Sequence, residues 1–436
     1  MSAHRYTALL GYGFLRLCVA LRELTLHHVR VLWHSLRHGG WRSLQDEMFP
    51  PDAVMAPTVD GRITAQSDGV RRKGILVIDR SLPRFDRDAG SRATWQYIQL
   101  LREMGFRVTV WGHDFLRREP YATLLEGMGV EVVSGGALVC GRWRGWIRAR
   151  AATLDYVLIH RPNVAVAYID FLRKATDARI LYFGVDLRWL RNQRRHDVER
   201  DPFHLAEARY WQAIENRLVG MAHAAYFYSR AETDMMAQQV PGARVRTVPL
   251  FIFQGKTGEG LAHEKREGLL FVGGFAHQPN VDGILWFIND IYPAVREQLG
   301  EVTLRVVGAN PPEALREKPG IILAGAVSDA ELQALYDRSR VVVAPLRYGA
   351  GIKGKVVEAV FQRVPLVTTT IGAEGMPEPE AVLEVSDLPH DFAAAVIQLY
   401  CDEDIWSARS SRMGAYVAEH FSATTARRVL EEDIFP

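Results

Sequence analysis

The sequence predicts an α/β protein built from two doubly wound parallel sheets, one after the other along the chain. Three observations support this fold class. Short runs of β-branched and aromatic residues alternate with amphipathic stretches between residues 73 and 420, which is typical of parallel sheets covered by helices. A strand, loop and helix that begin at Gly74 are repeated in form from Gly268. The chain has 436 residues, which is enough for two or three domains.

The composition is that of a globular protein without an unusual partner. Hydrophobic residues make up 48% of the chain and charged residues 24%, which is ordinary for a chain that buries a large core. A net charge of +2 gives no reason to expect nucleic acid as the main partner. The cysteines, Cys18, Cys140 and Cys401, lie far apart, so we expect no disulfide framework, no structural zinc and a cytoplasmic location.

Residues 1–72 are predicted to form a basic, amphipathic helical extension followed by a linker. Apolar residues between Leu9 and Leu36 recur at helical spacing, and Glu23 is the one acid before Asp46. Such a helix can lie on an anionic membrane surface, which would place residues 1–45 at the inner face of the membrane. It can equally dock on the rest of the chain or on a second subunit, and both interpretations stay open.

The first domain is expected at residues 73–250 and opens with a βαβ unit. Its strands are Gly74–Asp79 and Phe106–Trp111, and the helix between them is expected at residues 92–104. The loop before this helix holds Gly90 and Ser91 at the carboxyl edge of the predicted sheet, where α/β proteins bind ligands. Further strands are expected at residues 130–133, 156–159, 180–183, 225–228 and 245–249.

Two of these strands are followed by polar residues that are candidates for catalysis. His160 follows the strand at 156–159, and Asp186 follows the strand at 180–183. A lone histidine is more often a satisfied structural residue than a catalyst, and an acid after a strand often serves as a helix N-cap. The sequence leaves both interpretations of each residue open.

The second domain is expected at residues 251–420, after a hinge rich in glycine and lysine. Asp282 is expected to cap the helix that carries Ile284. A final helix, residues 421–436, is expected to cross back to the first domain. Strands are expected at residues 268–272, 302–307, 321–323, 341–344 and 366–369.

The stretch from Val341 to Ala359 carries the strongest functional signal. A β-branched run leads through a glycine-rich turn into an amphipathic helix, and this order presents backbone N–H groups to a phosphate. Lys353 and Lys355 stand where the helix begins, although the helix dipole disfavours cations there, so they indicate an anionic ligand. Glu358, one turn later, is placed to accept ribose hydroxyl groups. The alternative is that all three charges are simply solvated.

Together these motifs resemble the GT-B fold of nucleotide-sugar glycosyltransferases, in which two Rossmann-like domains face each other across a cleft. The second half resembles the retaining group 1 glycosyltransferases, family four. The resemblance covers residues 73–425 and leaves the N-terminal segment unexplained. It rests on residues 271–282, 306–308, 347–358 and 369–375, with weaker support from residues 86–91 and 185–187.

The resemblance implies a role for each matching residue. The second domain would bind the nucleotide-sugar donor, with Glu358 on the ribose. The first domain would bind the acceptor near Gly90 and Ser91. The implied catalytic residues are Lys355, Lys353, Asp186 and His160. The other implied donor-binding residues, some of which are also named above, are Gly273, Gly274, Asn280, Arg347, Gly349, Gly351, Lys353, Lys355 and Glu374.

The implied activity is transfer of a sugar from a nucleotide diphosphate to a glycan, a lipid-linked molecule or another acceptor, with retention, in polysaccharide or glycoconjugate biosynthesis. We expect no metal and no cofactor beside the donor. The sequence departs from the family pattern at Ala350, where many relatives carry an acid, and at Val185, where many carry a histidine. The alternatives are a nucleotide-sugar epimerase of the same fold and a non-catalytic donor-binding scaffold in a polysaccharide assembly complex.

Overall fold

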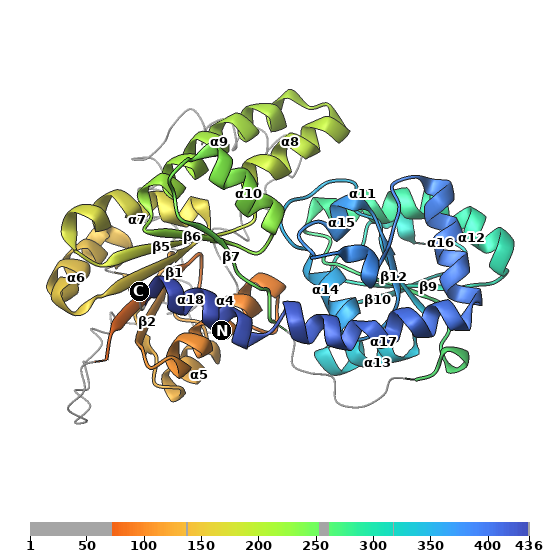
Figure 1. The fold of residues 1–436 in the computed structure, drawn as a ribbon, viewed down its shortest axis with the longest axis horizontal. Coiled ribbons are helices and arrows are strands. Elements are labelled where there is room, and N and C mark those ends of the chain that lie inside the picture. The colour runs from red at the N-terminus through yellow and green to blue at the C-terminus, as the bar shows by residue number, and fades with distance from the viewer. Residues whose placement is uncertain (1–71, 137, 253–260, 317, 435–436) are drawn as a thin grey trace, which may run out of the picture. The chain divides into compact units, whose positions relative to one another are not determined.

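The computed structural model describes residues 72–136, 138–252, 261–316 and 318–434 (Figure 1). The predicted N-terminal helices and most of the predicted hinge therefore lie outside the described residues. Among the helices that are described, none combines the length and the apolar character needed to cross a membrane.

The first sheet has seven strands in the order β3-β2-β1-β4-β5-β6-β7 (Figure 1). β1 is completely buried and pairs in parallel with β2 on one side and with β4 on the other. The chain therefore changes direction across the sheet between β1 and β4, which is the switch point where such sheets bind ligands. The strands are β1 Gly74–Asp79, β2 Arg107–Gly112, β3 Glu131–Val132, β4 Tyr156–His160, β5 Arg179–Val185, β6 Ala224–Phe227 and β7 Val245–Thr247.

The helix of the first βαβ unit begins earlier than the sequence predicted. Asp88 is its N-cap, and the carboxylate accepts a hydrogen bond of 2.8 Å from the backbone N–H of Ser91. Gly90 and Ser91, expected in a loop, therefore lie in the first turn of α4. The helices between β1 and β7 are α4 Ala89–Glu103, α5 Tyr121–Gly127, α6 Trp143–Arg150, α7 Pro162–Ala175, α8 Arg188–Glu199, α9 Pro202–Met221 and α10 Arg230–Gln239.

The second sheet has six parallel strands in the order β10-β9-β8-β11-β12-β13. Its change of direction lies between β8 and β11, so the stretch that carried the functional signal follows a strand at the switch point. Two sheets of this kind confirm the predicted fold class. The strands are β8 Leu269–Val272, β9 Leu304–Val307, β10 Ile321–Gly325, β11 Val341–Ala344, β12 Leu366–Thr368 and β13 Glu384–Val385.

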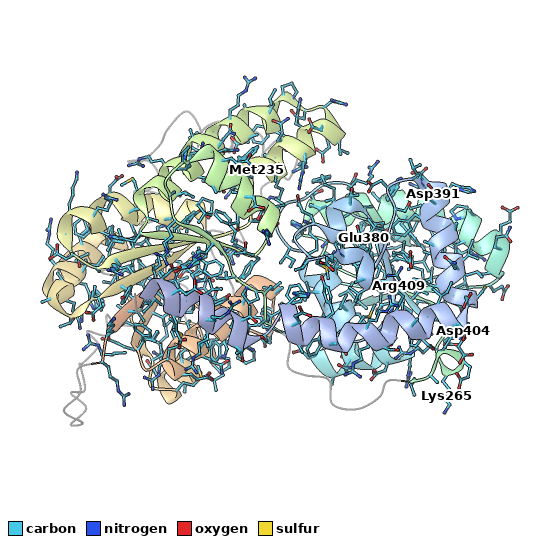
Figure 2. All side chains as sticks on the ribbon, viewed as in Figure 1. Met235, Lys265, Glu380, Asp391, Asp404 and Arg409 are labelled. Carbon is cyan, nitrogen blue, oxygen red and sulfur yellow. The ribbon has the colours of Figure 1, made fainter. Side chains whose placement is uncertain are left out.

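Helices cover the second sheet over a core that includes Phe271, Ile284, Val343 and Phe392, all fully buried. On α17, Arg409 forms an ion pair of 2.6 Å with Glu384 of β13 and is labelled in Figure 2. The helices are α11 Gln278–Trp286, α12 Tyr292–Leu299, α13 Asp329–Arg338, α14 Gly354–Phe361, α15 Thr370–Ala373, α16 Pro389–Cys401, α17 Glu403–His420 and α18 Ala423–Ile434.

The chain forms two compact units. Among the described residues, the first unit comprises those from 72 to 184, with 214–225 and 242–244, and the second comprises 185–213, 226–241 and those from 245 to 434. The helices α8 and α10 therefore belong to the second unit, together with the whole second sheet. Asp433 of α18 accepts a hydrogen bond of 2.9 Å from the hydroxyl of Tyr226 in β6, within the second unit. The domain boundary between residues 250 and 251 stays a prediction.

Candidate functional site

The glycine-rich turn after β11 delivers two lysines to the start of a helix. β11 is buried along its whole length, and α14 begins at Gly354 with Lys353 as its N-cap residue. Gly351 has a φ of 67°, in the left-handed region that favours glycine. A Cβ at Gly351 would also lie 2.8 Å from the Cβ of Asp186, so this turn packs directly on the residue that follows β5.

Lys355 is held by neutral groups. Its Nζ donates a hydrogen bond to Oδ1 of Asn280 and lies 5.0 Å from the centre of the Phe271 ring. Burial, which Glu358 opposes and Lys353 reinforces, lowers the pKa of Lys355 to about 7. No carboxylate of the described residues forms an ion pair with this ammonium group. An anionic ligand would supply the ion-pair partner that the ammonium group of Lys355 lacks within the protein.

Gly273 is required by the close approach of Lys355. A Cβ at position 273 would lie 2.7 Å from the Nζ of Lys355 and 2.8 Å from the Nδ2 of Asn280. A Cβ at Gly274 would meet no atom within 4 Å. Instead, the carbonyl of Gly274 accepts a hydrogen bond of 2.7 Å from Asn280. The structure thus brings these two glycines and Asn280 together with Lys355.

Lys353 belongs to a second group of charges. Its Nζ donates to the carbonyl of Gly351 and lies 3.6 Å from Oε2 of Glu374. Glu374 also accepts two hydrogen bonds from Arg194 of α8, of 2.7 and 2.6 Å. The same guanidinium donates to the carbonyl of Gly349 at 2.8 Å. Burial lowers the pKa of Lys353, and Glu374 opposes this change.

Glu232 of α10 is a buried acid that the sequence did not reveal. Its Oε1 accepts hydrogen bonds from the backbone N–H of Leu187 at 2.9 Å and of Gly351 at 2.7 Å, while Oε2 has no hydrogen-bond partner. Burial and the charge of Asp186 raise the pKa of Glu232 to about 8, so the carboxyl group carries its proton at neutral pH. The pattern Ser229-x-x-Glu232 would assign this residue to an ordinary helix cap.

Asp186 does not act as the N-cap of α8. The N-cap residue is Leu187, and Asp186 instead forms an ion pair of 2.7 Å with Arg191. The preceding Val185 has a φ of 69°, a strained conformation that costs on the order of 1–3 kcal/mol and is found mostly at functional sites. Asp186, the next residue, packs on the glycine turn at Gly351 and holds Arg191 by the ion pair.

His277 is another residue that sequence reasoning did not assign a role. It is the N-cap residue of α11, so the expectation that Asp282 caps this helix is wrong. Burial, together with Arg191 and Lys355, lowers the pKa of His277 to about 4. His277 is therefore a neutral imidazole within a cationic cluster at neutral pH.

Glu358 acts electrostatically on Lys355, whereas Arg347 pairs outside the two lysine groups. Glu358 accepts a hydrogen bond of 3.2 Å from the hydroxyl of Tyr336, which is completely buried and was not foreseen. Arg347 forms an ion pair with Asp282, and its side chain is 40% exposed. Among the described residues, no contact joins Arg347 to Lys353 or Lys355.

The remaining sequence candidates lie in the first unit, around the buried Asp79 at the end of β1. Asp79 accepts hydrogen bonds from Thr94 at 2.7 Å and from Arg161 at 2.8 Å. His160 is 1% exposed, with its Nδ1 3.5 Å from the hydroxyl of Thr94. Burial lowers its pKa to about 4, so His160 is neutral. A Cβ at Gly90 would lie 2.8 Å from Arg161.

Two further observations concern metal binding by the described residues. Among the described residues, no group of three histidines, cysteines or acids is arranged to hold a metal ion. Asp86 and Asp88 form an Asp-x-Asp pair, but Asp86 accepts a hydrogen bond from Tyr121 and Asp88 caps α4. The chemistry that the second unit does offer is a helix start with two lysines, which fits a phosphate or diphosphate.

Comparison with known proteins finds a family match in the second half of the chain. Residues 266–402 match the family model described as glycosyl transferases group 1, and over this stretch the match confirms the group 1 part of the predicted resemblance. The two doubly wound sheets are those of the GT-B fold. An uncharacterized 44.6 kDa protein from the cps region of Klebsiella pneumoniae is 32% identical over 24% of this chain. That match spans 30% of the length of the Klebsiella protein.

Solved structures share the fold at low sequence identity. Sucrose-phosphate synthase from Thermosynechococcus elongatus matches with a TM-score of 0.62 and 14% identity, over 83% of this chain and 98% of that protein. HepE from Anabaena, solved in complex with UDP and glucose, matches with a TM-score of 0.59 and 15% identity, over 84% of this chain and 100% of that protein. The group 1 glycosyltransferase match therefore lies within a chain that has the GT-B architecture over most of its length.

Proposed function

We propose that this protein is a glycosyltransferase that moves a sugar from a nucleotide-diphosphate donor to an acceptor hydroxyl. The observation that carries the proposal is the pair of half-buried lysines at the start of α14, Lys353 and Lys355, of which Lys355 has no carboxylate ion-pair partner. Removing a cation from water without a counter-charge costs free energy, and a bound diphosphate offsets that cost. The solved relative with bound UDP and glucose supports the same class of donor.

The donor would lie along the carboxyl edge of the second sheet. Its diphosphate would meet Lys355, Lys353 and the N–H groups at the start of α14, and its ribose would meet Glu358. Gly273 and Asn280 would form the wall beside Lys355. In this arrangement His277, being neutral, donates or accepts a hydrogen bond without adding charge.

Transfer breaks the bond between the anomeric carbon and the diphosphate oxygen, and the electron pair leaves with the diphosphate. The acceptor oxygen forms the new bond to the anomeric carbon, and its proton passes to the oxygen of the departing diphosphate. Positive charge already in place on the leaving group lowers the barrier, and a single such contact contributes about 3–4 kcal/mol in comparable sites. Lys355 and Lys353 would supply that charge, so no metal ion is needed in the proposed reaction.

The acceptor is proposed to be a glycan or a lipid-linked molecule in polysaccharide or glycoconjugate biosynthesis, with retention of configuration. The similarity to a Klebsiella pneumoniae protein in the cps region supports this setting. The first unit would bind the acceptor near Gly90 and Ser91, at the switch point between β1 and β4. Ala350 is buried in the glycine turn and supplies no acid there.

The test is a thermal-shift titration with a panel of nucleotide sugars and nucleoside diphosphates. A ligand at a hundred times its dissociation constant stabilises the folded state by about 2.7 kcal/mol, which is readily measured. We expect one nucleotide family to raise the melting temperature of the wild type and of Glu297→Gln, a control on the exposed face of α12. The rise should be lost in Glu358→Gln.

The nucleotide sugar that raises the melting temperature then distinguishes a glycosyltransferase from an epimerase and from a non-catalytic scaffold. A glycosyltransferase consumes the nucleotide sugar when an acceptor is present, whereas an epimerase converts it with no acceptor. A non-catalytic scaffold would show the shift and consume nothing. No shift with any member of the panel would overturn the assignment of the donor site.

A further inference from the structure

The helix α6, in the first unit, carries an unusual concentration of positive charge. Residues 142–150 contain four arginines and no acid. Trp143, Trp146 and Ile147 are buried and fix the helix to the body of the first unit. Arg142, Arg144 and Arg148 are exposed. One face of α6 is thus anchored by aromatic residues, and the opposite face presents guanidinium groups to its surroundings.

These exposed arginines have no acidic partners. No carboxylate of the described residues forms an ion pair with Arg142, Arg144 or Arg148. Three arginines of α8 are the opposite case, because each of the three is matched by an acid within the second unit. These pairs are Arg191 with Asp186, Arg194 with Glu374 and Arg195 with Glu199. On α6, Arg150 pairs with Glu131 at 3.8 Å, and the three exposed arginines keep their charge uncompensated.

The geometry of the arginines adds a second observation. Arg144 lies over the rings of Trp143 and Phe171, at 4.4 and 5.9 Å, and Arg148 lies 5.2 Å from the centre of the same Phe171 ring. Phe171 of α7 is half-buried and lies within cation–π distance of both guanidinium groups. Arg144 and Arg148 are also four residues apart on one helix, a spacing at which like charges repel.

We propose that this surface, defined by Arg142, Arg144, Arg148 and Phe171, docks on an anionic membrane surface. Arg144 and Arg148 on one side of the helix, beside an aromatic ring and with Arg142 at the helix start, match the charge of acidic headgroups and the preference of aromatic rings for the membrane interface. An anionic surface engages Arg144 and Arg148 together and relieves their mutual repulsion. The inference goes beyond the donor site and does not depend on it.

The experiment measures co-sedimentation of the full chain with vesicles of phosphatidylcholine, with and without phosphatidylglycerol. The variant is Arg144→Gln/Arg148→Gln, and a second variant, Arg144→Lys/Arg148→Lys, keeps the charge. The matched control is Lys265→Gln/Arg316→Gln, which removes two exposed charges from the second unit, where Lys265 is labelled in Figure 2. Melting temperatures of all variants establish that they are folded.

We expect the wild type to bind the anionic vesicles and to bind neutral ones weakly. Loss of two charges should weaken binding about thirtyfold, at about fivefold for each residue near the surface. The lysine variant and the control should bind like the wild type, and added salt should weaken all binding. All variants should keep the nucleotide-induced thermal shift, which separates this result from a failure of the donor-site assignment.

Three results would overturn the proposal. The first is no binding of the wild type to anionic vesicles. The second is equal binding of the wild type and the glutamine variant, which would assign membrane contact to residues outside α6. The third is equal loss in the control variant, which would show that net charge alone sets the binding.

Discussion

Arg194 and Glu374 are joined by two nearly parallel hydrogen bonds of 2.7 and 2.6 Å, although they are 180 residues apart in the chain. The same guanidinium holds the carbonyl of Gly349 at 2.8 Å. One side chain of α8 therefore fixes both the glycine turn before α14 and the segment that follows α15. The position of Lys353, which contacts Glu374 and Gly351, depends on this link.

The first prediction concerns this link. Arg194→Lys keeps the charge but cannot reproduce the paired hydrogen bonds of a guanidinium. We expect the affinity for the nucleoside diphosphate to fall about tenfold, because a misplaced glycine turn costs roughly one charge-assisted hydrogen bond. Isothermal titration calorimetry measures the change.

Arg195→Lys is the matched control for that experiment. Arg195 lies next in the sequence and pairs with Glu199 on the same helix, so its substitution should leave the affinity unchanged. Equal effects of the two substitutions would mean that α8 contributes net charge and does not position the turn.

The second prediction compares two adjacent glycines. Gly273→Ala places a methyl group 2.7 Å from the Nζ of Lys355, whereas Gly274→Ala meets nothing within 4 Å. Because Lys355 is long and flexible, its ammonium group should move away, leaving the fold intact. We expect Gly273→Ala to lose nucleotide binding at least tenfold and Gly274→Ala to bind normally, as measured by thermal shift. Normal nucleotide binding by both variants would contradict the assignment of Lys355 to the nucleotide-binding site.

Much of the structure of the second half of the chain could be predicted from the sequence, because the residue patterns that define it lie close together in the chain. β11 is a continuous β-branched run, and both lysines follow a glycine-rich turn in the next few residues. The start of α14 and the nearby positions of Lys353 and Lys355 follow from backbone propensity alone. The same local logic placed the strands of the first sheet to within a few residues.

The residues that the sequence did not reveal act over long distances in the chain. Glu232 bonds to a backbone group 119 residues away, and Tyr336 meets Glu358 across 22 residues. Each lies in an amphipathic helix whose pattern indicates packing. For the same reason the pattern could not show that Asp282 pairs with Arg347, and the role of Arg347 in donor binding stays a prediction.

The third prediction concerns the pH dependence of donor binding. The pKa of Lys355 is lowered to about 7 in the free protein by burial, and a bound diphosphate should raise it. Binding therefore takes up a proton above this pH. We expect the affinity to be steady just below pH 7 and to fall by up to about tenfold per pH unit above it.

Lys355→Arg provides the control, because a guanidinium stays charged throughout this range. Its binding should be weaker than that of the wild type but nearly independent of pH between 7 and 9. Calorimetric titration at several pH values measures both profiles. A wild-type affinity that does not change above pH 7 would contradict the assignment of Lys355 to the phosphates.

The fourth prediction concerns stability. Lys355→Met replaces a buried ammonium group with an apolar side chain of similar length, so it removes the cost of burying charge. The unfolding free energy at pH 7 should rise by up to about 4 kcal/mol, because folding lowers the pKa of Lys355 to about 7, while the nucleotide-induced shift disappears. Denaturant titration of the free protein measures the gain. A loss of stability would mean that Lys355 supports the fold and was not retained for a ligand.

The last prediction uses the buried acid that the sequence did not reveal. The pKa of Glu232 rises from 4.5 to about 8 on folding, because of burial and the charge of Asp186. Between these values the folded state binds one more proton than the unfolded state, so stability falls as the pH rises, by up to about 1.4 kcal/mol per pH unit.

Glu232→Gln keeps an oxygen for the N–H groups of Leu187 and Gly351 but cannot ionise. Its stability should equal that of the wild type near pH 4.5 and exceed it increasingly up to pH 8, as measured by urea unfolding across this range. A constant difference at all pH values would show that the carboxyl group is already ionised in the folded protein.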